Sequence, residues 1–185
     1  MKKNLFGIVA LLTVLPATSL VLPGCDTGTA GGITVPVFTV TSLSINSTTG
    51  KLLTATASAK GSNQSPQLSW DAVPDAACYA IFMVDESAGH WLHWRAIIAN
   101  KTNLSQGELS GAEYIGPYPP SGDDDHNYRI EVFALKQAPE APIGIFDDEN
   151  NYANMVNQLN AVGGGDNIIA RGHIIGKYKN GDNNN

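Results

Sequence analysis

The sequence predicts a mainly β protein, an antiparallel β-sandwich with one or two short peripheral helices. Many short stretches alternate between apolar and polar residues, as half-buried strands do. Residues 77–84 form a near-continuous apolar run, which is typical of a central strand covered on both faces. One late stretch has the spacing of an amphipathic helix. Many short strands with a single helix favour a sandwich.

The expected elements follow one another between residues 38 and 179, a length that suits one domain with one core. The expected strands are 39–45, 52–59, 67–70, 77–84, 91–98, 128–135 and 168–178. In 91–98, alternation places Trp91, His93 and Arg95 on one face and Leu92, Trp94 and Ala96 on the other. The helix should begin at the acidic residues 147–149 and end at the glycines 163–165.

The N-terminus has the pattern of a bacterial lipoprotein signal. Two lysines precede an apolar run that extends to Val21, and the small residue Gly24 stands just before Cys25. We therefore expect a signal peptide at 1–24, with Cys25 lipidated as the first residue of the mature chain. An ordinary secretory signal with a coincidental cysteine is the alternative. A cysteine that carries more than one acyl chain would anchor the protein stably on the extracytoplasmic face of a bacterial membrane.

Composition limits the partners and the cysteine chemistry. The net charge is −6 and becomes more negative when the two N-terminal lysines are removed, so nucleic acid is not an expected partner. Residues 25–37 are rich in Gly and Thr and should form a flexible tether, and 180–185 should form a disordered polar tail. Cys78 lies inside an apolar run, which indicates a small buried residue; a reactive thiol is the alternative.

A proline-rich loop and the strand after it contain the most informative residues. Residues 116–122 read Gly-Pro-Tyr-Pro-Pro-Ser-Gly, and the three prolines give this loop a preset extended path. His126 and Tyr128 lie two apart at the start of a strand, so both should project from one face beside the loop. Upstream, Asp85 ends one strand and His93 lies near the start of the next. Brought together, these side chains would form a polar pocket for a small ligand.

Each of these residues also has an ordinary structural explanation when taken alone. A histidine or a tyrosine between apolar residues, such as His93 or Tyr128, is often a core residue. His126 could cap a turn, and Asp85 could simply end a strand, because aspartate favours turns. The residues become more informative when their order along the chain is considered.

In that order, the motifs resemble the phosphatidylethanolamine-binding protein family, also called Raf kinase inhibitor-like, and its bacterial members most of all. The resemblance extends from about Phe38 to about Tyr178. It includes Ser65-Pro66-Gln67-Leu68-Ser69-Trp70, Val73-Pro74, His93-Trp94, the Gly-Pro-x-Pro-Pro loop and His126-x-Tyr128. The family usually has Asp-Pro-Asp where this chain has Asp85-Glu86-Ser87, and His-Arg-Tyr where it has His126-Asn127-Tyr128.

The resemblance implies the same sandwich fold and an anion-binding pocket. From the residues themselves, no metal or cofactor is expected. Carried over position by position, the ligand-binding residues are Asp85, His93, Tyr118, Pro119, Pro120, His126 and Tyr128. The imidazoles and the phenol would donate N–H and O–H groups to a phosphate-like oxygen, while Asp85 fixes the tautomer of one histidine or accepts a ligand donor.

Two functions are therefore expected from different classes. One is a binding protein for a small anion or a phospholipid headgroup. The other is a protein-interaction module that inhibits a kinase or a protease, and a protease suits an extracytoplasmic location better. Catalysis is not expected, because neither Ser87 nor Ser121 lies in a Gly-x-Ser-x-Gly elbow. A strand would direct His90 and His93 to opposite faces, and the acidic run 123–125 lacks the spaced ligands of a calcium loop.

Overall fold

A computed structural model describes residues 26–58, 60–99, 101–111 and 113–183. Its centre is a four-stranded antiparallel sheet in the order β6-β5-β8-β9. The strands of this sheet are β5 (Cys78–Asp85), β6 (Trp91–Ala99), β8 (His126–Leu135) and β9 (Ile168–Tyr178). A second, three-stranded sheet contains β3 (Val40–Thr41), β4 (Leu68–Trp70) and β7 (Asn103–Leu104).

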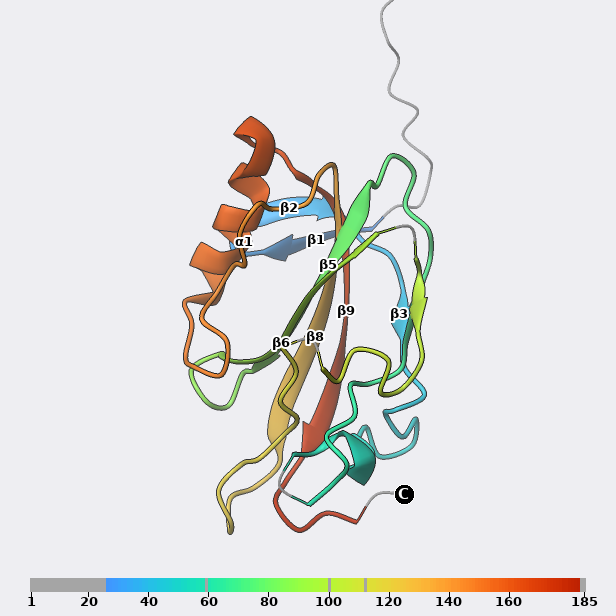
Figure 1. Ribbon diagram of the computed structural model, residues 1–185, viewed down its shortest axis with the longest axis vertical. Helices are drawn as coiled ribbons and strands as arrows, with labels where there is room; N and C mark the ends of the chain where they lie inside the picture. The colour runs from blue at the N-terminus through green and yellow to red at the C-terminus, as the bar shows by residue number, and fades with distance from the viewer. Residues whose placement is uncertain (1–25, 59, 100, 112, 184–185) are drawn as a thin grey trace, which may run out of the picture.

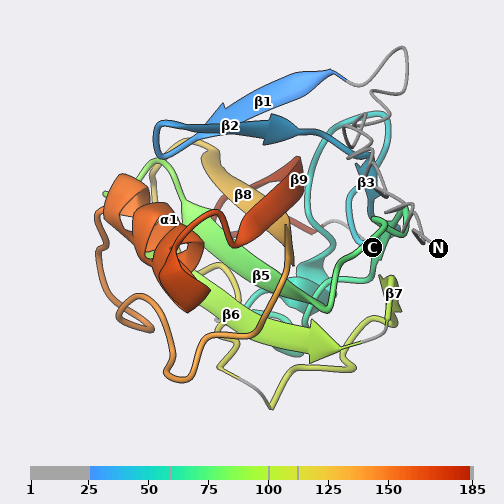
Figure 2. The same cartoon turned by 90° about the horizontal axis from the view of Figure 1, so that it is seen from above.

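The central sheet separates this second sheet from helix α1 (Tyr152–Ala161), as Figures 1 and 2 show from two directions. A hairpin of β1 (Thr27–Ala30) and β2 (Ile33–Pro36) lies near the helix in both views. Two short 3-10 turns complete the fold, η1 (Thr54–Thr56) and η2 (Val162–Gly164). The predicted antiparallel sandwich with peripheral helices is confirmed.

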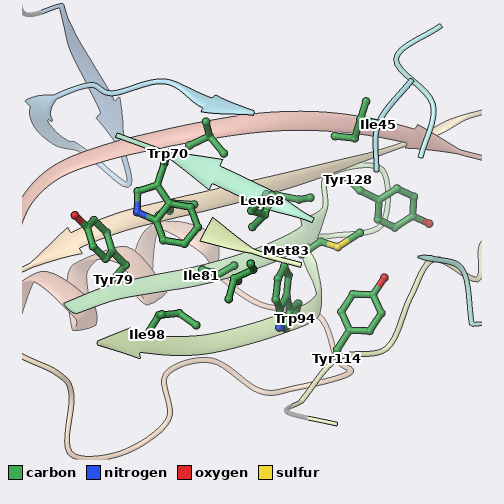
Figure 3. Packing of buried hydrophobic residues seen from close by; sticks show 14 of the residues in the cluster. Ile45, Leu68, Trp70, Tyr79, Ile81, Met83, Trp94, Ile98, Tyr114 and Tyr128 are labelled. Atoms are coloured by element: carbon green, nitrogen blue, oxygen red, sulfur yellow. The ribbon is translucent and has the colours of Figure 1, made fainter. Parts of the chain in front are cut away.

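The first hydrophobic core lies between the two sheets. Leu68 and Trp70 of β4 share it with the odd-numbered β5 residues Tyr79, Ile81 and Met83, and Figure 3 shows these side chains from close by. The rings of Trp70 and Tyr79 make an edge-to-face contact with centroids 5.3 Å apart, an arrangement that aromatic pairs favour.

The second core covers the opposite face of the central sheet. The even-numbered residues of β5 cluster here with the buried helix residues Met155, Val156 and Leu159. Because both faces are covered, all eight residues of β5 are buried, as its apolar sequence predicts. Cys78 belongs to this core at 4% exposure, and burial raises the pKa of its free thiol. The expectation of a buried, structural cysteine is confirmed.

Two of the expected strands are shortened or absent. Of 39–45, only Val40 and Thr41 form a strand. The stretch 52–59 contains the turn η1 in place of a strand, and the Thr56 hydroxyl donates a hydrogen bond to the Leu53 carbonyl at 2.7 Å. This local bond gives the backbone an alternative to a sheet ladder, so the threonine and alanine content of this stretch was a misleading signal.

The helix begins later than the acidic residues predict. Asn151 is its N-cap, and the Asn151 side chain accepts a hydrogen bond from the Asn154 N–H at 2.9 Å. The acidic residues 147–149 lie in the preceding turn, where Asp147 has a φ of +57°. The prediction that they start the helix is therefore wrong.

The expected flexible tether is, over its described residues, an ordered hairpin. Thr27–Ala30 pairs with Ile33–Pro36 across a turn at Gly31 and Gly32, whose φ values of 55° and 87° favour glycine. Its alternate residues Ile33 and Val35 pack against the second core. The glycine and threonine content suggested a flexible tether, but the alternation of apolar residues determines the structure of this segment. The predicted signal peptide 1–24 and Cys25 lie outside the described residues.

The predicted tail is also partly ordered. The Lys51 ammonium lies 2.8 Å from an Asp182 carboxylate oxygen, and Asn180 donates a hydrogen bond to the Pro119 carbonyl at 3.1 Å. Disorder is therefore the wrong prediction for 180–182. In the part of the chain that the structure describes, no helix is both long and apolar enough to cross a membrane.

Candidate functional site

A β-bulge in β6 gives His93 its position. Met83 of β5 pairs with Trp94, and the next residue, Val84, pairs with Leu92, so His93 is the extra residue. Trp94 therefore lies in the first core together with Met83, while Leu92 lies in the second core. The expected alternation is wrong beyond His93, because one inserted residue moves every later side chain to the opposite face.

The start of β8 supplies the other half of the site. His126 and Tyr128 lie on one face with ring centroids 6.4 Å apart, as their spacing predicts. Asp85 pairs with Tyr128 in the sheet register, and its Oδ2 lies 2.7 Å from His126 Nδ1. Because a carboxylate only accepts, His126 Nδ1 carries a proton and donates it. The other Asp85 oxygen accepts the Ser87 N–H at 2.8 Å, which fixes the turn after β5.

The positions that depart from the family's usual residues have structural partners. Ser87 Oγ accepts the Asn127 N–H at 3.0 Å, so it ties the turn after β5 to the start of β8. Glu86 accepts a hydrogen bond from Arg129 Nε at 2.6 Å. Neither Glu86 nor Ser87 lines the pocket.

The proline-rich loop is fastened to the segment around η1. Gly116 N–H donates to Asn63 Oδ1 at 2.7 Å, and the Gly116 carbonyl accepts from Ser58 Oγ at 3.0 Å. The Pro117 carbonyl accepts the Ser58 N–H at 3.2 Å. Prolines and these bonds together hold the loop as a fixed rim.

Tyr118 extends from this loop over His93. The two rings contact edge to face with centroids 5.4 Å apart. The Tyr118 hydroxyl donates to Asp147 Oδ1 at 2.5 Å, and the same oxygen accepts from Trp91 Nε1 at 3.0 Å. Asp147 thereby links Tyr118 of the loop to Trp91 at the start of β6.

These elements surround a cavity of about 350 Å³. Its lining contains all seven residues selected from the sequence, which are Asp85, His93, Tyr118, Pro119, Pro120, His126 and Tyr128. Ala88 and Trp91 also line it, and neither was predicted from the sequence. Trp91 was expected on the same face of its strand as His93, and this expectation could have identified Trp91 as a lining residue. Asp123 and Asp147, which contact lining residues, gave no such signal in the sequence.

The pKa values of the two histidines are shifted in opposite directions. Burial lowers the pKa of His93, which is 3% exposed, and its Nδ1 donates to the Ile115 carbonyl at 2.9 Å. Neutral His93 therefore has a free lone pair on Nε2. Burial also disfavours charge on His126, but its hydrogen bonds to Asp85 and Asp123 outweigh this and raise its pKa overall. His126 is thus the histidine of the site that holds a positive charge more readily.

Tyr128 presents an unpaired hydroxyl. Burial, followed by the charge of Asp85, raises its pKa, so the O–H keeps its proton. Asp85 also acts on the hydroxyl as a nearby acceptor and raises its pKa further, but the two groups make no hydrogen bond of ordinary geometry. Within the described residues its oxygen has no hydrogen-bond partner.

Replacing Asp85 should reverse the pKa shift of His126. In Asp85→Asn the carboxylate charge is lost while the burial stays, so the His126 pKa should fall below its wild-type value in an NMR titration of the ring protons. Asp123→Asn, the matched control, should lower it less, because Asp123 is the more distant partner at 3.4 Å. An unchanged His126 pKa in Asp85→Asn would contradict the assignment.

The raised pKa also predicts how stability changes with pH. A histidine whose pKa is higher in the folded chain stabilises the fold fully below the unfolded value of about 6.5. That stabilisation is lost as pH rises through the folded pKa. Relative to His126→Gln, the wild type should therefore lose stability in urea unfolding as the pH rises above about 6.5.

The other sequence candidates lie elsewhere. His90 stacks on Tyr152 with ring centroids 5.5 Å apart and does not line the pocket. Ser121 is exposed and likewise is not part of the lining. Asp125 pairs with Lys51 at 3.0 Å. Over the described ranges, no three His, Cys, Asp or Glu side chains are grouped as metal ligands.

Comparison with solved structures supports the fold. The crystal structure of Escherichia coli YbcL, described as a member of the mammalian PEBP family, has a TM-score of 0.57 and 29% identity, and the match covers 77% of this chain and 98% of YbcL. CT736 from Chlamydia trachomatis has a TM-score of 0.56 and 23% identity over 77% of this chain and 97% of CT736. At that identity CT736 supports the fold alone.

Sequence comparison gives relatives in two bacteria. LppC of Mycobacterium tuberculosis, provisionally named as a lipoprotein, is 31% identical over 102 residues, which are 47% of this chain and 51% of LppC. YbcL of E. coli K12 is 30% identical over 101 residues, 42% of this chain and 55% of YbcL. The chain spans about half the length of these curated relatives. Residues 43–179 match the family model for phosphatidylethanolamine-binding protein, and the chain therefore belongs to that family.

Proposed function

We propose that this protein binds a small ligand through a phosphate-type group, while anchored outside the cytoplasm, and leaves the ligand chemically unchanged. The observation that carries the proposal is the Tyr128 hydroxyl. It is fully buried, lines the pocket and lacks a partner among the described residues. A buried unpaired O–H costs about 1–3 kcal/mol, and a ligand oxygen in the pocket would remove that cost.

His126 provides a charged donor for the same ligand. Asp85 holds its Nδ1, and Nε2 lies 3.4 Å from a carboxylate oxygen of Asp123. The Asp123 side chain is 48% exposed, so it can turn toward solvent when a ligand oxygen takes its place at Nε2. A charged N–H makes a stronger bond to a phosphate oxygen than a neutral donor does.

The carboxylates near the pocket limit the class of ligand. Asp85, Asp123 and Asp147 surround the histidines and would repel a doubly charged phosphate. A ligand that pairs one negative phosphate with a positive ammonium group suits this charge pattern better. The family description names phosphatidylethanolamine, whose headgroup has both charges. A phosphoethanolamine-type group is therefore the ligand class that we propose.

Binding without turnover is the form of activity that the pocket chemistry favours. The hydroxyls in the lining are those of Tyr118 and Tyr128. Burial raises the pKa of Tyr118 to about 12 and raises that of Tyr128 as well, so both are poor nucleophiles. The Asp85–His126 pair therefore has no readily deprotonated hydroxyl among the lining residues that it could activate as a nucleophile.

The anchoring part of the proposal rests on the N-terminal sequence. A charged start, an apolar run and a small residue precede Cys25, as in a bacterial lipoprotein signal. The relative LppC also has a provisional lipoprotein name. Lipidation of Cys25 would place the domain on an extracytoplasmic membrane face.

Calorimetric titration tests the pocket. Phosphoethanolamine should bind more tightly at pH 6 than at pH 8, because protonated His126 donates a charge-assisted bond. His126→Gln should lose about 1–3 kcal/mol of binding free energy with little loss of fold. Tyr128→Phe removes only the hydroxyl and should weaken binding in the same direction.

Asp123→Asn is the matched variant for which the opposite change, tighter anion binding, is expected. It removes the carboxylate that competes for His126 Nε2, so inorganic phosphate, which has no ammonium group to pair with Asp123, should bind more tightly at pH 6 than it does to wild type. Inorganic phosphate should bind more weakly than phosphoethanolamine, because it lacks the ammonium group. Equal affinity in wild type and in His93→Ala/His126→Ala would show that the anion binds elsewhere.

A further inference from the structure

The hairpin that follows Cys25 is fastened to the domain at several points. Ala30 is buried in the second core, where Ile33 and Val35 also pack. Arg171 of β9 donates from Nη1 to the Thr29 carbonyl at 2.6 Å. These contacts hold β1 and β2 against the central sheet.

Asp26, the first described residue, is also hydrogen-bonded to the domain. Val37 N–H donates to the Asp26 carbonyl at 2.9 Å, and Val37 itself bridges to Arg171. In the sequence, Asp26 directly follows Cys25. A lipid on Cys25 would therefore be attached one residue before a part of the chain that is hydrogen-bonded to the domain.

An apolar groove of about 520 Å³ lies beside this point. Val37 is part of its lining, together with Phe38, Val73, Pro74 and Ile169, and all five side chains are at least partly exposed. One lysine, Lys136, and one aspartate, Asp75, give the groove little net charge. An exposed apolar surface of this kind suits contact with a lipid interface without a requirement for anionic lipids.

The groove and the ligand pocket lie at opposite ends of the central sheet. Lys136 of the groove follows the last residue of β8, whereas His126 of the pocket is the first. Nine residue steps along a strand span roughly 30 Å. Figure 1 shows the same separation, with β1 and β2 near the top and the yellow segment that enters β8 at the bottom.

We propose that the groove around Phe38, Val73 and Ile169 is the surface that rests on the bilayer, so that the ligand pocket opens away from it. This inference rests on the proposed lipidation of Cys25. The pocket would then take its phosphate group from water, as a soluble phosphoethanolamine compound, and could not reach the headgroups of its own bilayer. The groove is then the membrane-contact surface, and the phosphoethanolamine group in the pocket comes from a soluble compound and not from a lipid headgroup of the same bilayer.

Fluorescence quenching tests the orientation. The full-length lipidated protein carries Cys78→Ala, and a bimane label is attached at Ala72→Cys beside the groove or at Asp124→Cys beside the pocket. Both positions are exposed, so neither label should unfold the protein. Vesicles contain phosphatidylcholine with brominated acyl chains. The label at 72 should lose most of its emission, and the label at 124 should keep the emission it has on vesicles without bromine.

Equal quenching at both positions, stronger quenching at 124, or none at either would overturn the proposal. To separate this outcome from a failure of lipidation, the mature chain is also coupled through the aminothiol of its N-terminal Cys25 to vesicles that contain a cyanobenzothiazole lipid, which leaves the introduced cysteine free for the label. The mass of the natural N-terminal peptide is also measured. An unmodified mass would refute the lipid anchor, while the coupled protein still reports the orientation.

The ligand source is tested on the same vesicles. Soluble phosphoethanolamine should displace a fluorescent phosphoethanolamine probe from the pocket. Phosphatidylethanolamine in the protein's own bilayer should not displace it, even in large excess. Displacement by the bilayer lipid would show that the pocket reaches the membrane and would overturn the outward orientation. Failure of the probe to bind at all would instead count against the proposed function.

Discussion

Arg171→Met should be among the most destabilising single substitutions in this protein, with a loss of about 3–5 kcal/mol in the free energy of unfolding. Glu131 is 0% exposed and Arg171 is 5% exposed, so their ion pair is buried on the helix side of the central sheet. Arg171 donates to Glu131 from Nε at 3.2 Å and also from Nη2. Methionine would fill similar space but leave the Glu131 charge buried. Among the ion pairs of the described chain, Arg129, at 3.6 Å, would be its remaining charge partner.

A double variant separates charge from packing. In Glu131→Met/Arg171→Met both charges are absent, and replacing a buried pair by apolar residues is often close to neutral. Urea unfolding should therefore show that the double variant recovers much of the loss. It should not recover all of it, because Arg171 also holds the hairpin through the Thr29 carbonyl at 2.6 Å. A single variant that loses less than about 1 kcal/mol would contradict the buried-charge argument.

The strands that could be predicted are those in which one pattern extends over many residues. The continuous apolar sequence of β5 and the alternation of β8 decide their place in the sheet, and both predictions are confirmed. β3 and β7 have two residues each, too few for any period to be detected. The β1–β2 hairpin was missed because its glycine and threonine content outweighed the alternation of two apolar residues.

The bulge in β6 shows a different limit. An inserted residue leaves no mark in the local composition, so the period of two was continued through His93. Arg95 consequently lies on the face opposite to the expected one, where its Nε donates to Glu113 at 2.6 Å. Only the partner strand reveals that one residue is extra.

The candidate site was largely predictable because its residues belong to motifs that keep their order along the chain. Asp147 lies outside those motifs and reaches the pocket through tertiary packing. Its N–H donates to the Leu92 carbonyl at 2.9 Å, and the Leu92 N–H donates to the Asp148 carbonyl at 2.9 Å. These backbone bonds place the Asp147 carboxylate beside Tyr118, and backbone bonds between distant segments have no sequence signature.

Gly116→Ala is the second substitution with a large expected effect, and it acts on both the fold and the pocket. A Cβ on residue 116 would lie 1.8 Å from the Thr56 carbonyl oxygen and 2.9 Å from the Ser58 nitrogen. Both are backbone atoms, so no side-chain rotation can make room. Overpacking usually costs about 1–3 kcal/mol and sometimes more, and we expect the upper end of that range here.

The same clash should displace the pocket rim. Gly116 is held by Asn63 at 2.7 Å, and the loop it begins contains Tyr118, Pro119 and Pro120 of the lining. Phosphoethanolamine affinity should therefore fall in Gly116→Ala even at temperatures where the protein stays folded.

Gly111→Ala is the matched control, because a Cβ there meets no atom within 4 Å and its φ is not in the left-handed region. Its free energy of unfolding should stay within about 0.5 kcal/mol of wild type, with unchanged affinity. If thermal unfolding and calorimetry gave the same results for both variants, contact between the proline-rich loop and the Thr56 backbone could not be what fixes the pocket rim.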